Sequence, residues 1–195
     1  MRVLIVYCHP RPDSFCVALR DAAVATLEAQ GHSVELRDLY AENFVPVLSA
    51  EERARFYDEG ANLQGIESHV ASLQRAEALL FVYPTWWFGL PGMLKGWLDR
   101  VWVPGVAFRF GGPTVLRPLL GNIRRIGVIT TYGSPRWLLW LAGWPDWRLL
   151  RPGLRPLCAR GCRLDWIAMT RMDTCTAPER ERFLADLRRR LAGWR

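Results

Sequence analysis

Residues 3–15 read VLIVYCHPRPDSF, and this stretch decides how the chain begins to fold. Its first five side chains form a continuous apolar run rich in β-branched residues, which is typical of a strand buried on both faces. Pro10 and Pro12 end the run, and Ser14 opens a stretch that places Leu19 and Leu27 on one helical stripe. The segment is therefore predicted to form a strand, a loop and a helix.

The same order of strand, loop and helix returns along the chain. Further strands are predicted at residues 34–39, 78–83, 126–130 and 164–169. Capping patterns or apolar stripes predict helices that begin near Ser49 and others over residues 66–73, 91–101 and 176–191. Because apolar strands alternate with helices, we expect a three-layer, doubly wound α/β fold with a parallel sheet. No repeat or linker divides the chain, so residues 1–195 are predicted to form one domain.

The composition excludes several classes of protein. Half of the residues are hydrophobic and 23% are charged, values that exclude a disordered or collagen-like chain. The formal net charge of +7 favours anionic partners such as nucleotides, nucleic acid or an acidic membrane face. The arginines are scattered and Lys95 is the only lysine, so no nucleic-acid-binding arm is expected. The N-terminal apolar run is too short for a signal peptide or a membrane span, which predicts a cytoplasmic protein.

The five cysteines indicate neither a metal site nor a disulfide framework. They form no CxxC pair, and no cluster of histidine and cysteine has zinc spacing, so we expect reduced, buried thiols. Cys8 follows the first strand, as the nucleophile of a cysteine phosphatase would. That chemistry needs an arginine six residues later, and residue 14 is a serine.

The loops after the first, third and fourth strands are the candidate site, because doubly wound sheets bind ligands beyond the carboxyl ends of their strands. In the first loop, His9, Arg11 and Ser14 precede a helix N-terminus, where free amides suit a phosphate. Alternatively, Ser14 only caps the helix and His9 is an ordinary loop residue. The chain has no GxGxxG after its first strand and no phosphate-binding P-loop, which disfavours both nucleotide-binding folds that use them.

The second loop, residues 84–92, reads PTWWFGLPG. Three consecutive aromatic residues at a strand end suit stacking against a planar cofactor, and Gly89 and Gly92 allow backbone amides to approach it closely. An apolar satellite cluster or a dimer contact is the alternative. The third loop, residues 130–134, reads TTYGS and offers polar groups for the edge of a heterocycle, although such a sequence is also an ordinary turn.

These loops carry a resemblance to a known family. His9-Pro10, Ser14-Phe15 and the pattern PxxWFxxPxxLKxWxDxV over residues 84–101 resemble the flavodoxin-like NAD(P)H:quinone oxidoreductase family. They are also similar to the ancillary oxidoreductases of glutathione-gated potassium-efflux systems. The similarity is strongest over residues 1–20 and 77–134. It implies the strand order 2-1-3-4-5 and a bound flavin, for which FMN is expected ahead of FAD because no adenine-binding insertion is evident.

The resemblance implies roles for the residues of the three loops. His9, Ser14 and Phe15 would lie at the phosphate end of the flavin. The second loop would follow the ribityl chain and the ring of the flavin. Catalytic backbone amides near Trp87 and Phe88 would face the N5 and O4 edge of the ring. The flavin-binding residues of this loop are Pro84, Thr85, Trp86, Trp87 and Phe88. The third loop matches a TTGG turn at the pyrimidine edge. Its residues are Thr130, Thr131, Tyr132 and Gly133. Tyr132 stands where a glycine is usual, and its side chain could narrow the pocket.

Residues outside these loops are assigned by the same resemblance. Phe108 and Phe110 match aromatic positions that line the substrate cavity from the partner subunit in animal quinone reductases, which implies a homodimer. Those enzymes carry a tyrosine and a histidine after the TTGG turn, and this chain has neither there. Arg136 is expected to take a catalytic part instead, by offsetting negative charge near N1 of the reduced flavin.

Residues 136–148, RWLLWLAGWPDWR, are unusually rich in tryptophan. On a single helix, Trp137, Trp140, Leu141 and Trp144 would share one face. We favour an apolar lid over the active site in which Trp137 contacts the substrate. A dimer contact, an interfacial element that dips into a membrane, and simple core packing are the alternatives.

Together these features predict a flavin-dependent NAD(P)H oxidoreductase. It would reduce quinones or similar electrophilic aromatic acceptors by two electrons, with donor and acceptor using one cavity in turn, a ping-pong reaction. A flavin-binding regulatory subunit of a membrane transporter is the main alternative. A small electron-carrier flavodoxin is disfavoured, because the first loop lacks the hydroxyl-rich phosphate turn of those typically acidic proteins.

Overall fold

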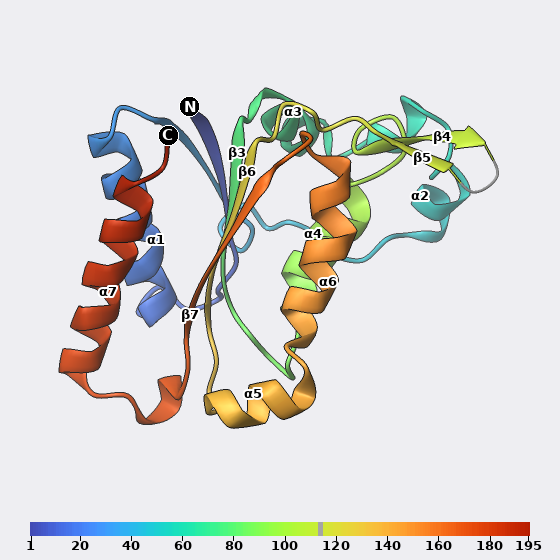
Figure 1. Ribbon diagram of the computed structural model, residues 1–195. Coiled ribbons are helices and arrows are strands. Elements are labelled where there is room, and N and C mark those ends of the chain that lie inside the picture. The colour runs from blue at the N-terminus through green and yellow to red at the C-terminus, as the bar shows by residue number, and fades with distance from the viewer. Residues whose placement is uncertain (113–114) are drawn as a thin grey trace.

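The computed structural model describes residues 1–112 and 115–195, and its centre is a parallel sheet of five strands (Figure 1). In spatial order the strands are β2 (Ser33–Asp38), β1 (Arg2–Tyr7), β3 (Ala78–Pro84), β6 (Arg125–Thr131) and β7 (Arg163–Met169). Because β6 and β7 are the fourth and fifth strands of this sheet, the predicted order 2-1-3-4-5 is confirmed.

The register of the strands brings four loops to one edge of the sheet. Tyr7 at the end of β1 pairs with Val82 of β3, and Pro84 at the end of β3 pairs with Thr131 of β6. Thr131 in turn pairs with Met169, the last residue of β7. The segments that leave these strands therefore start side by side.

Helices cover both faces of the sheet, which gives the three predicted layers (Figure 1). On one face lie α1 (Phe15–Ala29) and α7 (Ala177–Ala192), and on the other lie α3 (Glu67–Arg75), α4 (Gly92–Val101) and α6 (Pro145–Leu154). Successive residues of β1 serve opposite layers: Val3 and Ile5 belong to the core beneath α1 and α7, and Leu4 and Val6 to the other core.

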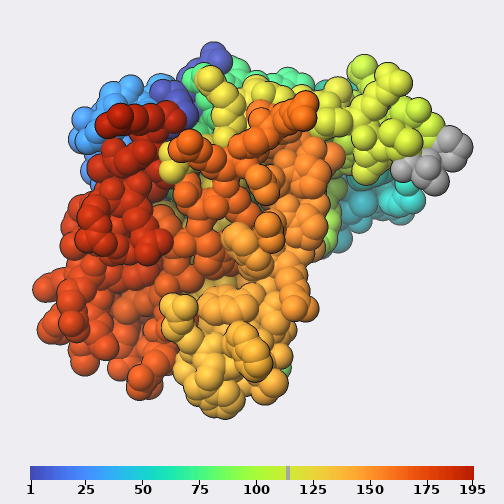
Figure 2. Space-filling model, in the orientation of Figure 1, coloured from blue at the N-terminus to red at the C-terminus, as the bar shows by residue number. Residues whose placement is uncertain are grey.

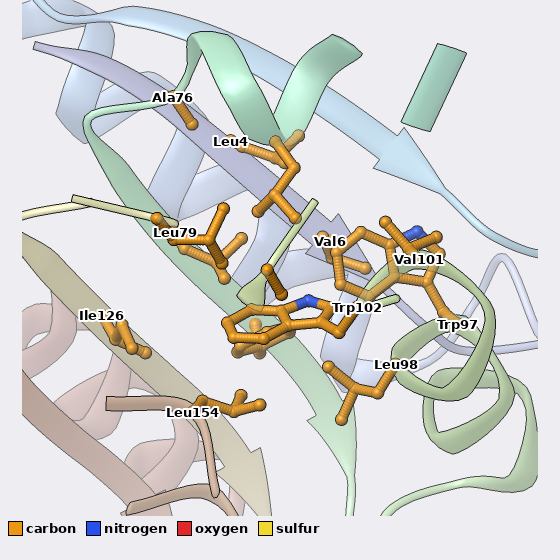
Figure 3. Close-up of a cluster of buried hydrophobic side chains, with 14 of the residues drawn as sticks. Leu4, Val6, Ala76, Leu79, Trp97, Leu98, Val101, Trp102, Ile126 and Leu154 are labelled. Carbon is orange, nitrogen blue, oxygen red and sulfur yellow. The ribbon is translucent and has the colours of Figure 1, made fainter. Parts of the chain in front are cut away.

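The second core is built around two indoles, as Figure 3 shows. Trp97 of α4 is fully buried, and Trp102 just after the helix is nearly so. Both pack among aliphatic side chains from β1 and α4, which include Val6, Leu98 and Val101. Burial of each such side chain stabilises the fold by about 1.5–3 kcal/mol, so α4 and the loop that precedes it are held firmly against the sheet.

Both capping patterns read from the sequence form as predicted. At α2 (Ala50–Ala54), the Ser49 hydroxyl accepts from the Glu52 backbone N–H, and the Glu52 carboxylate accepts from the Ser49 N–H. At α7, the Glu179 carboxylate accepts from the backbone N–H of Thr176. Three short 3-10 turns complete the helical elements: η1 (Ala61–Leu63), η2 (Arg155–Leu157) and η3 (Met172–Thr174).

The sequence did not indicate a hairpin that projects from one end of the molecule (Figure 1). It consists of the antiparallel strands β4 (Phe108–Gly112) and β5 (Val115–Pro118). Their side chains are mostly exposed, so the apolar pattern that marks a buried strand is missing.

The tryptophan-rich segment differs from the single helix that its periodicity predicted. It forms α5 (Arg136–Ala142) and α6, because Gly143 adopts a left-handed φ of 77° and Pro145 starts a new helix. Trp144 caps α6 and does not share the α5 face, which corrects that prediction. None of the helices in the described ranges is long and apolar enough to cross a bilayer.

Candidate functional site

A cavity of about 770 Å³ opens at the carboxyl edge of the sheet. Its walls come from the loops after β1, β3, β6 and β7, so the three loops singled out in the sequence do converge. The lining residues are His9, Ser14, Phe15, Cys16, Pro84, Thr85, Trp86, Trp87, Phe88, Thr131, Tyr132, Gly133, Ser134, Met172 and Asp173.

The first loop presents the N-terminus of α1 to this cavity. Ser14 occupies the N-cap position, but its side chain makes no capping hydrogen bond. The hydroxyl is buried and has no partner among the described residues. A buried, unsatisfied hydroxyl is costly, so the alternative in which Ser14 only caps the helix does not account for it. An anionic ligand at the helix N-terminus would satisfy both the hydroxyl and the first helical amides.

His9 is oriented by its own loop. Its Nδ1 accepts a hydrogen bond of 3.0 Å from the backbone N–H of Arg11, which leaves the ring proton on Nε2. Burial lowers the pKa of His9 below its ordinary value, so the ring is neutral at neutral pH. Arg11 does not line the cavity, because its guanidinium is paired with the Asp13 carboxylate. His9 can therefore act as a neutral hydrogen-bond donor.

The second loop is a tight turn closed by two backbone hydrogen bonds between Trp86 and Gly89, of 3.1 and 3.0 Å. Its two central residues, Trp87 and Phe88, have φ values of 51° and 60°. Positive φ at both central positions is the pattern of a type I′ turn, which normally uses glycine or asparagine. Large aromatic residues in this conformation are strained, which is a feature of functional sites.

The strained turn leaves groups free to bind a ligand. The Trp87 side chain is 98% exposed, so no packing within the chain explains the ring. Within the described ranges, neither Trp87 nor Phe88 donates a backbone hydrogen bond to another residue. The turn therefore offers amides and an aromatic face at the mouth of the cavity.

The third loop is fixed from behind by a buried carboxylate that sequence reasoning missed. Asp146 of α6 is 1% exposed, and its Oδ2 accepts from the hydroxyls of Tyr132 at 2.6 Å and Thr85 at 3.1 Å. Thr130 is fully buried and exchanges a 2.8 Å hydrogen bond with Thr85, so it supports the wall and does not line the cavity. Tyr132 is part of the wall, and its effect on the width of the cavity stays a prediction.

Asp146 is buried without a cation in ion-pairing distance among the described residues. Burial raises its pKa above the ordinary value, and the hydrogen bonds from Tyr132, Trp147 and Thr85 oppose that effect. The network ties the loops after β3 and β6 to α6. The Tyr83 hydroxyl also donates to Asp146 Oδ2, at 3.4 Å. No sequence pattern could identify this network, because Tyr83 and Asp146 lie 63 residues apart in the sequence.

A fourth loop, after β7, was also missed. It contributes Met172 and Asp173, and the Met172 N–H donates to the Tyr132 carbonyl at 2.9 Å. Gly133 lies close beside it: a Cβ there would lie 2.3 Å from Asp173 Oδ2, so the Asp173 carboxylate would have to shift. The predicted position of the fifth strand was the available signal, since its carboxyl end lies at the same edge as the other loops.

Besides Thr130, four predicted site residues do not line this cavity. Arg136 and Trp137 lie on α5, are exposed and are not among the lining residues, so their predicted roles beside the flavin and the substrate stay predictions. Phe108 and Phe110 lie on the β4–β5 hairpin, where their rings pack edge to face at 5.6 Å. The structure thus brings the cofactor set together, except for Thr130, but not the predicted substrate set.

Cys8 does not have the environment of a catalytic nucleophile. Burial raises the pKa of Cys8 to about 12, so it remains a neutral thiol. A cysteine phosphatase needs a thiolate, so Cys8 lacks this feature as well as the arginine six residues later. All five cysteines are free; four are buried and Cys175 is half-buried.

The cavity fits a planar heterocycle with an anionic tail. The α1 N-terminus, Ser14 and His9 lie at one side of the cavity, without a formal charge, and the aromatic turn with its free amides forms the other. Among the described lining residues, only Asp173 carries a formal charge at neutral pH. A flavin mononucleotide has this combination of phosphate, chain and ring.

Comparisons with known proteins agree with this geometry. A family model described as flavodoxin-like fold matches residues 1–193. NAD(P)H dehydrogenase (quinone) 1 of Rattus norvegicus is 34% identical over 149 residues, which cover 68% of this chain and 54% of the rat protein. A ribosyldihydronicotinamide dehydrogenase-like protein, traD, of Penicillium crustosum is 35% identical over 126 residues, 57% of this chain and 47% of its own length. The chain therefore spans about half the length of these two relatives.

A solved structure gives a match over nearly the whole chain. The NAD(P)H:quinone oxidoreductase of Methanothermobacter marburgensis superimposes with a TM-score of 0.86 at 29% identity, covering 99% of this chain and 98% of that one. The family model, these relatives and the shared architecture together show that the chain belongs to the flavodoxin-like NAD(P)H:quinone oxidoreductase family.

Proposed function

We propose that this protein is a flavin-dependent NAD(P)H oxidoreductase that reduces quinones or similar electrophilic aromatic acceptors by two electrons. The observation that carries the proposal is the cavity itself, which is lined both by Ser14, whose buried hydroxyl has no hydrogen-bond partner among the described residues, and by a strained aromatic turn. The relatives named for NAD(P)H and quinone support the same donor and acceptor classes.

Each wall of the cavity has a part in holding the cofactor. Ser14, the α1 amides and neutral His9 would bind its phosphate, and Thr85 and Thr131 would line the chain that follows. The amides of Trp87 and Phe88 would donate to the polar edge of the ring, where they stabilise the charge that develops on reduction. When bound, a flavin supplies reversible acceptance of a hydride, which these side chains do not provide.

We assign FMN as the cofactor. The uncharged anion site is suited to one terminal phosphate, and no insertion that would bind an adenine is evident in the sequence. NADPH or NADH is the donor, and a ping-pong order follows if donor and acceptor occupy the same mouth of the cavity in turn.

We further propose that the active form is a homodimer. The β4–β5 hairpin extends away from the carboxyl edge of its own sheet (Figure 1), which supports the proposal that Phe108 and Phe110 would serve a partner's site. Phe110 is 54% exposed, as a residue that awaits a partner would be. We keep the single-domain organisation and the cytoplasmic location as predictions.

Reconstitution followed by steady-state kinetics tests the proposal. Protein saturated with FMN should oxidise NADPH or NADH with a benzoquinone acceptor, and double-reciprocal plots at several quinone concentrations should be parallel. Ser14→Ala should weaken FMN binding about tenfold, since a hydrogen bond to a charged group contributes about 1.5 kcal/mol. Ser68→Ala, at an exposed position on α3, is the matched control. Tight FMN binding without turnover would contradict the enzyme assignment and favour the regulatory-subunit alternative.

A further inference from the structure

Helix α5 exposes a set of large apolar side chains that core packing does not explain. Trp137, Trp140 and Leu141 are 67%, 76% and 69% exposed, and their spacing puts them on one helical face. Leu149 of α6 is 44% exposed. The core-packing alternative is therefore wrong for these residues, which we call the tryptophan patch.

The segment that carries the patch is strongly cationic. Residues 134–163 contain six arginines, no lysine and one acidic residue, Asp146, which is buried beneath the surface. The arginines are Arg136, Arg148, Arg151, Arg155, Arg160 and Arg163. Because the only carboxylate faces inward, the outer surface of this segment carries positive charge alone.

Two of these arginines lie against the segment that follows α5, and four of them line one hollow. The Arg148 guanidinium lies against Gly143, at the turn that joins the patch to α6, and Arg151 lies 5.6 Å from the centre of the Trp147 ring. Arg148, Arg151, Arg155 and Arg160 line a cavity of about 550 Å³. In the described ranges, none of these four is ion-paired with a carboxylate. Figure 2 shows α5 and α6 as one continuous surface at this side of the molecule.

We propose that the tryptophan patch and these arginines form a docking surface for an anionic phospholipid bilayer. Exposed indoles and leucines suit the boundary between headgroups and acyl chains, and arginines beside them suit the phosphates. This inference goes beyond the proposed function and does not depend on it.

The charge argues for a lipid surface over a contact between the like patches of two copies. Such a contact at a two-fold axis would set six arginines against six, without an exposed carboxylate from this segment to pair them. An anionic bilayer has the complementary charge. The exposed leucines argue against nucleic acid, which would use the arginines and stack on the indoles but leave Leu141 and Leu149 in water.

Co-sedimentation with vesicles tests the proposal on the full chain. The protein should sediment with vesicles of phosphatidylcholine and phosphatidylglycerol, and far less with phosphatidylcholine alone. Binding should fall when salt is raised from about 0.1 M to about 1 M, because the screening length shrinks from about 10 Å to about 3 Å.

Two double variants separate the contributions of the arginines and of the tryptophan patch, and a third double variant is the control for the arginines. Arg148→Gln/Arg151→Gln should lower the partition coefficient roughly 30-fold, since each arginine near such a surface contributes about fivefold. Arg182→Gln/Arg188→Gln removes the same charge from α7, on the opposite face of the sheet, and should have a much smaller effect. Trp137→Ser/Trp140→Ser should reduce binding to the anionic vesicles at both salt concentrations, while thermal unfolding stays unchanged because both rings are exposed.

Three outcomes would overturn the proposal. Equal binding to both kinds of vesicle would remove the role of the arginines. Equal losses in the α6 and α7 arginine pairs would show an effect of net charge alone. Absence of vesicle binding would refute the proposal directly. Sedimentation velocity would then show whether the surface instead joins two copies, which Trp137→Ser/Trp140→Ser would dissociate, or binds a single-stranded oligonucleotide.

Discussion

In the turn at Trp87 and Phe88, two aromatic residues adopt a left-handed backbone conformation that such residues disfavour. A left-handed conformation costs a residue with a Cβ about 1–2 kcal/mol, and the exposed Trp87 ring regains nothing by packing within the chain. Glycine would be the more stable choice at this position. The aromatic ring is therefore retained for what it contacts outside the chain.

Two substitutions at Trp87 isolate this strain. Trp87→Gly should unfold at a higher urea concentration than Trp87→Ala, with a free-energy difference of about 1 kcal/mol, since only glycine relieves the positive φ. The measurement is urea denaturation of the flavin-free protein. Trp140 gives the matched control, because it is also exposed but helical, and there the glycine variant should be the less stable of the two. The same order of stability at both positions would contradict the strain.

Asp146 makes the stability of the site depend on pH. Its pKa is raised in the folded state by burial, so the folded chain holds this proton more tightly than the unfolded chain does. The stability from this group is fully present below its ordinary pKa of 3.8 and is lost as the pH rises through the folded value.

Asp146→Asn removes this titration and keeps the shape of the side chain. The free energy of unfolding of the variant, relative to the original protein, should therefore increase as the pH rises from about 4 to 7. Urea denaturation at several pH values measures the difference. A difference that stays constant, or that falls with rising pH, would show that Asp146 has no raised pKa in the folded protein.

At the scale of the elements, the sequence predicted the alternation of strands and helices, because short apolar runs such as residues 78–83 are typical of buried strands. Every residue of β3 is buried. The β4–β5 hairpin was not readable, since its exposed side chains carry no alternation. The break between α5 and α6 was signalled by Gly143 and Pro145, but the spacing of the tryptophans argued for one continuous helix.

Helix α4 lies close to the loop before α2, and Gly96 allows this approach because it has no side chain. A Cβ on Gly96 would lie 2.1 Å from the Pro46 carbonyl oxygen, so Gly96→Ala should lower the free energy of unfolding by about 1–3 kcal/mol. Gly153, in α6, has open space around it, and Gly153→Ala should instead raise it by about 0.5–1 kcal/mol. Thermal or urea unfolding of the two variants checks both signs. Equal effects would contradict the close approach of α4 to Pro46.

At the scale of the whole molecule, the parallel sheet gathers the site by placing four loops at one edge. The sequence predicted three of these loops, because their aromatic and hydroxyl residues stand directly after buried strands. It could not place Asp146 or Asp173, since both reach the site through contacts between distant segments. It also could not show that Arg136 and Trp137 are exposed, because that depends on how the short helix α5 packs against the rest of the fold.

An anaerobic absorbance titration tests the central claim most directly. The FMN-loaded protein is titrated with NADPH between 300 and 550 nm, and then with a quinone. We predict that the visible bands bleach in a single phase with one equivalent of NADPH and return with one equivalent of quinone. Failure to bind FMN, a long-wavelength band that persists at half reduction, or bleaching that the quinone does not reverse would contradict the account.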